Sequence, residues 1–240
     1  MLQKEPENVI YRATEVEGPT FTWNGLISIQ TGAIPSQGLA AFITYADYRE
    51  SVFSNLKKGD KNYYFGDNVW LPYTRNHEDR FKAITFDYNS FALRSINQND
   101  HLVVVADIVA RKDFNNIFVH IHEFDAAVHL DSLKSDLAIE KIEKTNEAMK
   151  ALIESIDDDT TLVIASDHGL SNNGHGGFDE ISRIGVFFAY RKKGFVGSRR
   201  PEFAVKREKF REMDICNILH YYIGTTSPLN SYGDLPPELL

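Results

Sequence analysis

The stretch that decides the fold starts with the apolar run Ile117-Phe-Val-His-Ile121 and ends with Thr161-Leu-Val-Ile-Ala165. Both runs are typical of buried strands. Between them, Asp131–Ile156 carries apolar residues at roughly helical spacing, with charges at the other positions. Asp131 or Ser132 is placed to cap this predicted helix. A strand, a long helix and a second strand form a βαβ unit, which predicts an α/β fold with a parallel sheet.

Shorter patterns predict further elements. Tyr63–Phe65 and Gly185–Tyr190 are apolar runs of the kind found in buried strands. Lys209–Ile223 is predicted to be a helix that ends at Gly224, because glycine readily adopts the left-handed conformation of a helix C-terminus. His101–Ala110 fits a strand, by its consecutive valines, or a helix. No repeat or linker-like run interrupts the chain, so we expect one domain.

The composition is that of an ordinary globular protein. Of 240 residues, 42% are hydrophobic and 25% are charged, which excludes a disordered chain, a collagen and a coiled-coil rod. The net charge of -8 argues against nucleic acid as a partner. The single cysteine, Cys216, forms no internal disulfide. Since the chain shows neither a signal peptide nor a membrane-spanning stretch, we expect it to be soluble.

Residue types that bind metals follow two predicted strands. Asp125 and His129 follow the first strand of the βαβ unit, and Asp167, His168 and His175 follow the second. Ligands collect at the carboxyl ends of parallel strands, and Asp and His are the zinc ligands used when no thiolate is present. Each cluster alone is typical of a solvated surface or a turn. Two clusters at successive strand ends together predict a metal site.

Thr20 is a candidate nucleophile. It precedes the apolar run Leu26–Ile29, which ends at Gly32, so a helix is expected to start near Thr20. Backbone N–H groups at a helix N-terminus favour an anion such as phosphate. The alternative is a plain helix cap, a role that Thr fills well, and the local sequence alone favours the cap.

Several segments in the same order resemble the lumenal catalytic domain of the GPI ethanolamine-phosphate transferases, which belong to the alkaline phosphatase superfamily. They are Gly18–Thr22 with Thr31–Pro35, Phe65–Trp70, Val119–His129, Ala165–Gly177, and Asp214–Leu219 with the tail Pro228–Leu240. The resemblance covers nearly the whole chain, and Asp-His-Gly followed by Gly-His-Gly-Gly is its most specific part. It implies an alkaline-phosphatase-like α/β core, with a mostly parallel sheet flanked by helices on both faces.

The resemblance also implies a role for each matching residue. Thr20 is similar to the catalytic threonine. Asp125, His129 and His175 resemble the ligands of one zinc ion, and Asp167 and His168 resemble ligands of a second ion towards which Thr20 points. His120, Asp67 and Trp70 match positions that we interpret as structural.

The chain departs from the family pattern in two places. No aspartate in an Asp-x-x-Arg segment ends a strand before Thr20, and Cys216-Asn217 replaces the usual Pro-Thr after Asp-Ile. We therefore expect residues 1–240 to be a single domain that lacks its first strand and the membrane part. With one ligand missing, the Thr20-side zinc is expected to bind more weakly, and metal content to be nearer one zinc than two.

The implied activity is metal-dependent transfer of phosphoethanolamine from phosphatidylethanolamine to a mannose of a GPI-anchor precursor. The transfer passes through a covalent threonine intermediate. The implied location is the lumenal side of the endoplasmic reticulum membrane, where a membrane-embedded partner subunit is compatible with the resemblance. Two alternatives stay open: a metal-dependent phosphodiesterase or phosphatase with water as acceptor, and a catalytically impaired remnant with a binding or scaffold role.

Overall fold

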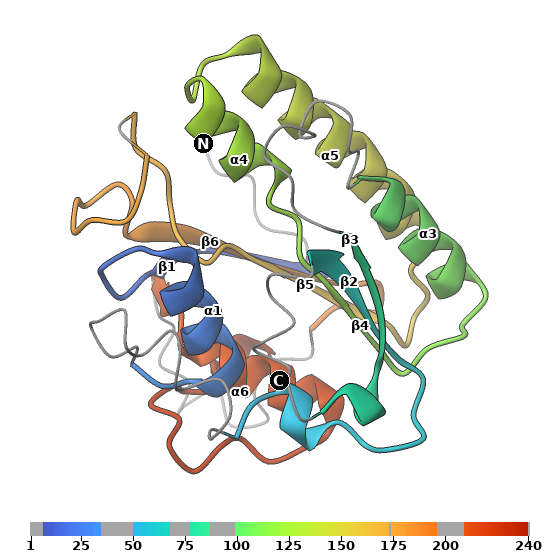
Figure 1. Cartoon of the computed structure of the whole chain (residues 1–240). Helices are drawn as coiled ribbons and strands as arrows, with labels where there is room; N and C mark the ends of the chain where they lie inside the picture. Colours follow the sequence, from blue (N-terminus) through green and yellow to red (C-terminus); the bar gives the residue numbers. More distant parts are fainter. Residues whose placement is uncertain are drawn as a thin grey trace. The chain divides into compact units, whose positions relative to one another are not determined.

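The computed structural model describes residues 7–34, 50–67, 77–86, 99–172, 174–195 and 209–239 (Figure 1). It divides into two compact units. The first unit takes its residues from Met1–Asn55, Asp157–Ser171 and His175–Leu240, and the second from Leu56–Ile156 and Asn172–Gly174. A single domain over residues 1–240 stays a prediction. Within the described ranges, no helix has the length and apolar character needed to cross a membrane.

A four-stranded mixed sheet forms the centre of the first unit. Its strands, in sheet order, are β5 (Thr161–Ala165), β6 (Ile184–Arg191), β1 (Val9–Glu15) and β7 (Lys209–Arg211). Strand β6 is antiparallel to both β5 and β1, and β1 is parallel to β7. Strands β5, β1 and β7 therefore run in one direction, and their carboxyl ends lie at one edge of the sheet.

Helices α1 (Thr22–Thr31) and α6 (Asp214–Ile223) lie on the same side of this sheet (Figure 1). They pack over an apolar core drawn from strands and helices: Ile10, Phe187, Ala189, Phe210, Ile215, Ile218 and Leu239. Gly224 ends α6 with φ of 76°, which confirms the predicted stop. The predicted helix start at Lys209 is wrong, because residues 209–211 pair with β1 as strand β7.

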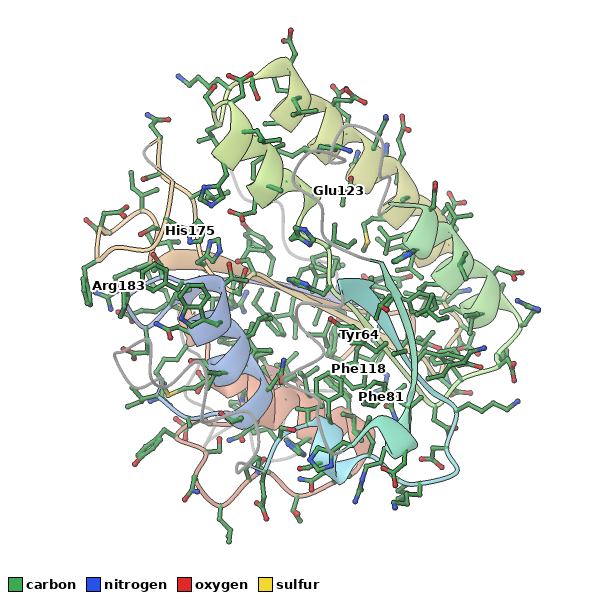
Figure 2. The ribbon with its side chains drawn as sticks, viewed as in Figure 1. Tyr64, Phe81, Phe118, Glu123, His175 and Arg183 are labelled. Atoms are coloured by element: carbon green, nitrogen blue, oxygen red, sulfur yellow. The ribbon has the colours of Figure 1, made fainter. Side chains whose placement is uncertain are left out.

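The second unit has a three-stranded sheet in which every pairing is parallel. Its strands, in sheet order, are β3 (Lys82–Phe86), β2 (Asn62–Asp67) and β4 (Asn116–Val119). Its helices are α3 (Asn99–Ala110), α4 (Glu123–Leu130) and α5 (Asp136–Ser155). The rings of Tyr64 and Phe81 lie near each other, with centroids 6.3 Å apart (Figure 2). The segment His101–Ala110 is helical because α3 packs along α5.

Helix α5 starts later than the sequence predicts. The residue at its N-cap is Ser135, whose hydroxyl accepts a hydrogen bond from the Ala138 N–H at 3.2 Å. A start at Asp131 or Ser132 is therefore wrong. The preceding helix, α4, extends to Leu130, so the chain needs the intervening residues to turn back before α5 begins.

A buried ion pair joins α4 to α5. The Lys141 ammonium lies 3.3 Å from the Glu123 carboxylate, and the two side chains are 5% and 0% exposed. Figure 2 labels Glu123 at the start of α4. Because a buried charge is costly without its partner, this pair holds α4 at a fixed position on α5.

The α/β class and the four strands predicted from apolar runs are confirmed. The parallel βαβ unit is wrong, because β4 pairs with β2 while β5 pairs antiparallel with β6. A single mostly parallel sheet is therefore not what the described residues form. Strands β1, β3 and β7 were not predicted. Strand β1 precedes Thr20 but ends at Glu15, so it carries no terminal aspartate.

Candidate functional site

One edge of the four-stranded sheet gathers the chemically active residues of the first unit. Asp167 and His168 follow β5, the segment from Glu17 to Thr22 follows β1, and Glu212 follows β7. Since these three strands run in one direction, their following residues meet at one edge, as ligand-binding residues do in α/β proteins. The residues between β5 and β6, which include His175, return to the same edge where β6 begins (Figure 2).

Thr20 is fully buried and bound to the loop that contains Gly176. Its hydroxyl oxygen accepts a hydrogen bond from the Gly176 N–H at 2.9 Å and lies 3.3 Å from the Gly177 carbonyl and 3.2 Å from the Ser182 hydroxyl. The interpretation of Thr20 as a helix cap is wrong. The N-cap residue of α1 is Phe21, which makes no side-chain cap bond. The Thr20 hydroxyl instead accepts the hydrogen bond from Gly176.

His168 and His175 are oriented alike. The His175 Nδ1 atom lies 2.6 Å from the Thr20 carbonyl oxygen, and the His168 Nδ1 atom lies 3.1 Å from the Gly169 carbonyl oxygen. A carbonyl only accepts, so each Nδ1 carries the proton and each Nε2 carries the lone pair. The two rings stack with centroids 3.7 Å apart. This is the tautomer and orientation of metal-binding histidines whose other nitrogen donates to the backbone.

Two oxygen atoms lie close to the His168 Nε2 atom. Thr22 Oγ1 lies 3.3 Å from it, and Asp167 Oδ2 lies 3.5 Å from it. In the tautomer above, the carboxylate oxygen and Nε2 are both electron-pair donors, an arrangement that a cation stabilises. Imidazole, carboxylate and hydroxyl donors without thiolate fit a divalent ion such as zinc. The residues present therefore fit a metal.

Thr22 was not predicted as a functional residue. It is the first residue of α1, so its hydroxyl lies at the N-terminus of the helix, where the backbone dipoles favour an anion. The sequence Thr20-Phe-Thr22 offers two candidate hydroxyls two residues apart. Only the position of the helix start distinguishes one from the other. The signal that could have found Thr22 is therefore the boundary of α1, the least certain feature of a sequence-based prediction.

Glu212 is the second residue that sequence reasoning missed. It is fully buried directly after β7, and its backbone N–H donates to the Glu15 carbonyl at 2.9 Å. Burial and the nearby Asp167 carboxylate raise the pKa of Glu212 well above its ordinary value, and the Ser28 hydroxyl and Glu17 backbone lower it less. A buried acid beside another acid is unusual without a compensating group.

The second unit holds the other two predicted ligands. Asp125 and His129 lie on α4, with Asp125 Oδ1 3.6 Å from His129 Nε2. The prediction that these residues point the same way is confirmed, because side chains four apart share a helix face. A Cβ atom placed on Gly174 would lie 3.8 Å from His129 Cε1, so these two residues lie close together within the second unit. Trp70 and the side chain of Asp67 lie outside the described residues.

A protein-family model of the metalloenzyme superfamily matches residues 85–195. The catalytic subunit of human GPI ethanolamine phosphate transferase 3 is 24% identical over 251 aligned residues, which cover all of this chain and 22% of that protein. The chain is a distant homologue of the GPI ethanolamine phosphate transferases. This homologue spans about a fifth of the length of its human relative. The segment matched by the metalloenzyme model contains the five predicted metal ligands but neither Thr20 nor Thr22.

The fold of this chain is similar to those of solved structures. The C-terminal periplasmic domain of EcEptC from Escherichia coli matches with a TM-score of 0.56 at 13% identity, over 93% of this chain and 73% of that one. A protein of the alkaline phosphatase superfamily from Vibrio parahaemolyticus matches with a TM-score of 0.56 at 10% identity, over 95% and 61%. The described residues therefore have an α/β fold similar to the folds of these two solved domains.

Proposed function

We propose that this chain carries the catalytic core of a metal-dependent phosphoethanolamine transferase. Its donor is phosphatidylethanolamine, and its acceptor is a mannose of a GPI-anchor precursor. The observation that carries the proposal is the approach of Thr22 Oγ1 and Asp167 Oδ2 to the His168 Nε2 atom, at 3.3 and 3.5 Å. The names of the relatives supply the substrate class.

The proposed metal ligands form two sets. Asp125, His129 and His175 hold one zinc ion, and Asp167 and His168 contribute to a second. In support of the first set, Asp125 and His129 share one face of α4, with Asp125 Oδ1 3.6 Å from His129 Nε2. In support of both sets, the backbone carbonyls orient each loop histidine through its Nδ1 atom, as they do in many metal-binding histidines. Bound zinc supplies positive charge for the phosphoryl oxygens and lowers the pKa of a nucleophilic hydroxyl.

The proposed nucleophile is Thr22. The family resemblance predicts Thr20, but the Thr20 hydroxyl is buried and bound to the Gly176 N–H. Thr22 is half-buried at the start of α1, where helix N–H groups favour a phosphate. Its oxygen forms a bond to phosphorus, the bond from phosphorus to the diacylglycerol oxygen breaks, and that oxygen takes up a proton. The mannose hydroxyl then displaces Thr22 from phosphorus.

Thr20 then acts as a positioning residue. Its carbonyl accepts from His175 Nδ1, and its hydroxyl holds the loop on which His175 lies. In this account the chain acts on the lumenal side of the endoplasmic reticulum membrane. A membrane-embedded partner subunit would present the lipid donor. This agrees with the description of the human relative as a catalytic subunit.

The test is the release of diacylglycerol from phosphatidylethanolamine by the zinc-loaded chain, with and without a mannose-containing GPI precursor. We expect zinc-dependent release and phosphoethanolamine on the precursor. Equal release of free phosphoethanolamine with and without precursor would identify a phosphodiesterase instead. No release by a chain that holds zinc would contradict both enzymatic interpretations and favour a binding or scaffold role.

A further inference from the structure

Glu212 is a fully buried carboxylate that the proposed mechanism has not yet used. Among the described residues, none donates a hydrogen bond of ordinary geometry to its carboxyl oxygens, although the Ser28 hydroxyl and the Glu17 backbone lie near enough to lower its pKa. The nearby Ser28 hydroxyl donates instead to the Ala33 carbonyl at 3.3 Å. A buried polar group without a partner carries a large desolvation cost, so its retention calls for a missing partner.

Gly25 shows where the Glu212 carboxylate lies. A Cβ atom placed on Gly25 would be 2.6 Å from Glu212 Oε1, 2.7 Å from Asp167 Cβ and 2.2 Å from the Asp167 carbonyl oxygen. The Glu212 carboxylate and the Cβ and carbonyl oxygen of Asp167 therefore lie beside the same residue of α1. Gly25 follows Thr22 by three residues, so both positions lie on the same face of α1. Only glycine leaves room for the Asp167 backbone and the Glu212 carboxylate there.

The charges that act on Glu212 are negative. Asp167 and Glu17 are the charged groups that influence it, and both are carboxylates. Two neighbouring carboxylates in a buried setting repel each other unless a cation or a proton lies between them. The neighbouring His168 Nε2 and Thr22 Oγ1 are further donor atoms suited to a cation.

We propose that Glu212 is a metal ligand, the second carboxylate of the site formed by Asp167, His168 and Thr22. The four side chains then offer two carboxylates, one imidazole and one hydroxyl, a complete set for a tetrahedral zinc ion. This inference rests on the proposed function. It raises the expected zinc content from nearer one ion to two, because a complete second site binds a second zinc tightly.

The experiment is a calorimetric zinc titration of the chelator-treated full chain. The test variant is Glu212→Gln, which keeps the shape and removes the charge. The matched control is Glu180→Gln, which removes the same charge from an exposed position of the same unit. His168→Ala identifies the binding step that belongs to this site. We expect two zinc ions in the wild type and in the control, and at least tenfold weaker binding of one ion in Glu212→Gln.

Thermal unfolding gives a second readout. Without metal, Glu212→Gln is expected to unfold at the same or a higher temperature than the wild type, because it removes a like charge beside Asp167. With zinc, its gain in unfolding temperature is expected to be smaller than that of the wild type. A glutamate with a purely structural role would not make the variant at least as stable as the wild type without zinc and less stabilised by zinc. If Glu212→Gln fails to fold, Glu212→Asp is titrated instead, and its retracted carboxylate is expected to weaken the same ion.

The outcomes separate the two proposals. Two tightly bound zinc ions in both the wild type and Glu212→Gln would overturn the role of Glu212 and leave the proposed function standing. No zinc binding by the wild type would overturn both. Loss of one ion in Glu212→Gln but not in Glu180→Gln supports both.

Discussion

The Thr22 hydroxyl lies 3.3 Å from His168 Nε2, whereas the Thr20 hydroxyl two residues earlier accepts the Gly176 N–H at 2.9 Å. The two threonines therefore have different tasks. Thr20 holds the loop that carries His175, and Thr22 presents its hydroxyl to the imidazole and carboxylate that follow β5. This division of roles leads to separate predictions for the two residues.

Replacing Thr20 by valine is expected to lower the free energy of unfolding by about 1–3 kcal/mol, because it leaves the buried Gly176 N–H without its acceptor. Chemical denaturation measures this loss. Thr20→Ser, which keeps the hydroxyl, is the control and should retain most of the stability. A Thr20→Val variant as stable as the wild type would show that the hydrogen bond to Gly176 does not hold the loop.

Replacing Lys141 by methionine is expected to cost about 3–5 kcal/mol, because it leaves the buried Glu123 carboxylate without its cation. The double variant with Glu123→Gln should recover much of that loss. Lys144→Met removes an exposed lysine from the same helix, so its effect should stay within about 0.5 kcal/mol. Equal losses from the two lysine variants would contradict the importance of the buried pair.

Cys216 is expected to resist alkylation in the folded protein. Burial raises the pKa of its thiol to about 12, so almost no thiolate exists at pH 8, and the thiolate is the reactive form. Iodoacetamide should label Cys216 only after denaturation, as read by intact mass. Rapid labelling of the native protein at pH 8 would show that α6 opens readily.

Local pattern was enough to predict several elements. The continuous apolar runs of β5 and β6 and the periodic apolar positions of α5 carry their own signals, and Gly224 ends α6 where a left-handed residue is needed. Strand β1 was missed because its sequence mixes arginine, threonine and glutamate with apolar residues. It is a strand because β6 and β7 pair with it on both sides.

Strand partners depend on residues far apart in the sequence. The run that became β5 looks the same whether its neighbour is parallel or antiparallel, so the βαβ prediction had no local evidence against it. The start of α5 was uncertain for a related reason. Asp131, Ser132 and Ser135 are all good N-cap residues, and the extent of α4 selects the last of them.

The candidate site was predictable where residue types cluster in sequence. Asp167 and His168 follow a predicted strand directly, so their common position at its carboxyl end could be expected. Glu212 lies far from that segment in the sequence and follows a strand of three residues. Only the parallel pairing of β7 with β1 brings it to the same edge of the sheet.

The central claim is that Thr22 forms the covalent intermediate, and one measurement tests it most directly. The zinc-loaded chain is incubated with phosphatidylethanolamine, quenched and digested, and the peptide that contains both threonines is fragmented in a mass spectrometer. The account predicts a phosphoethanolamine adduct on Thr22 that Thr22→Ala abolishes and Thr22→Ser restores in part. An adduct on Thr20, or an unchanged rate of transfer by Thr22→Ala, would contradict it.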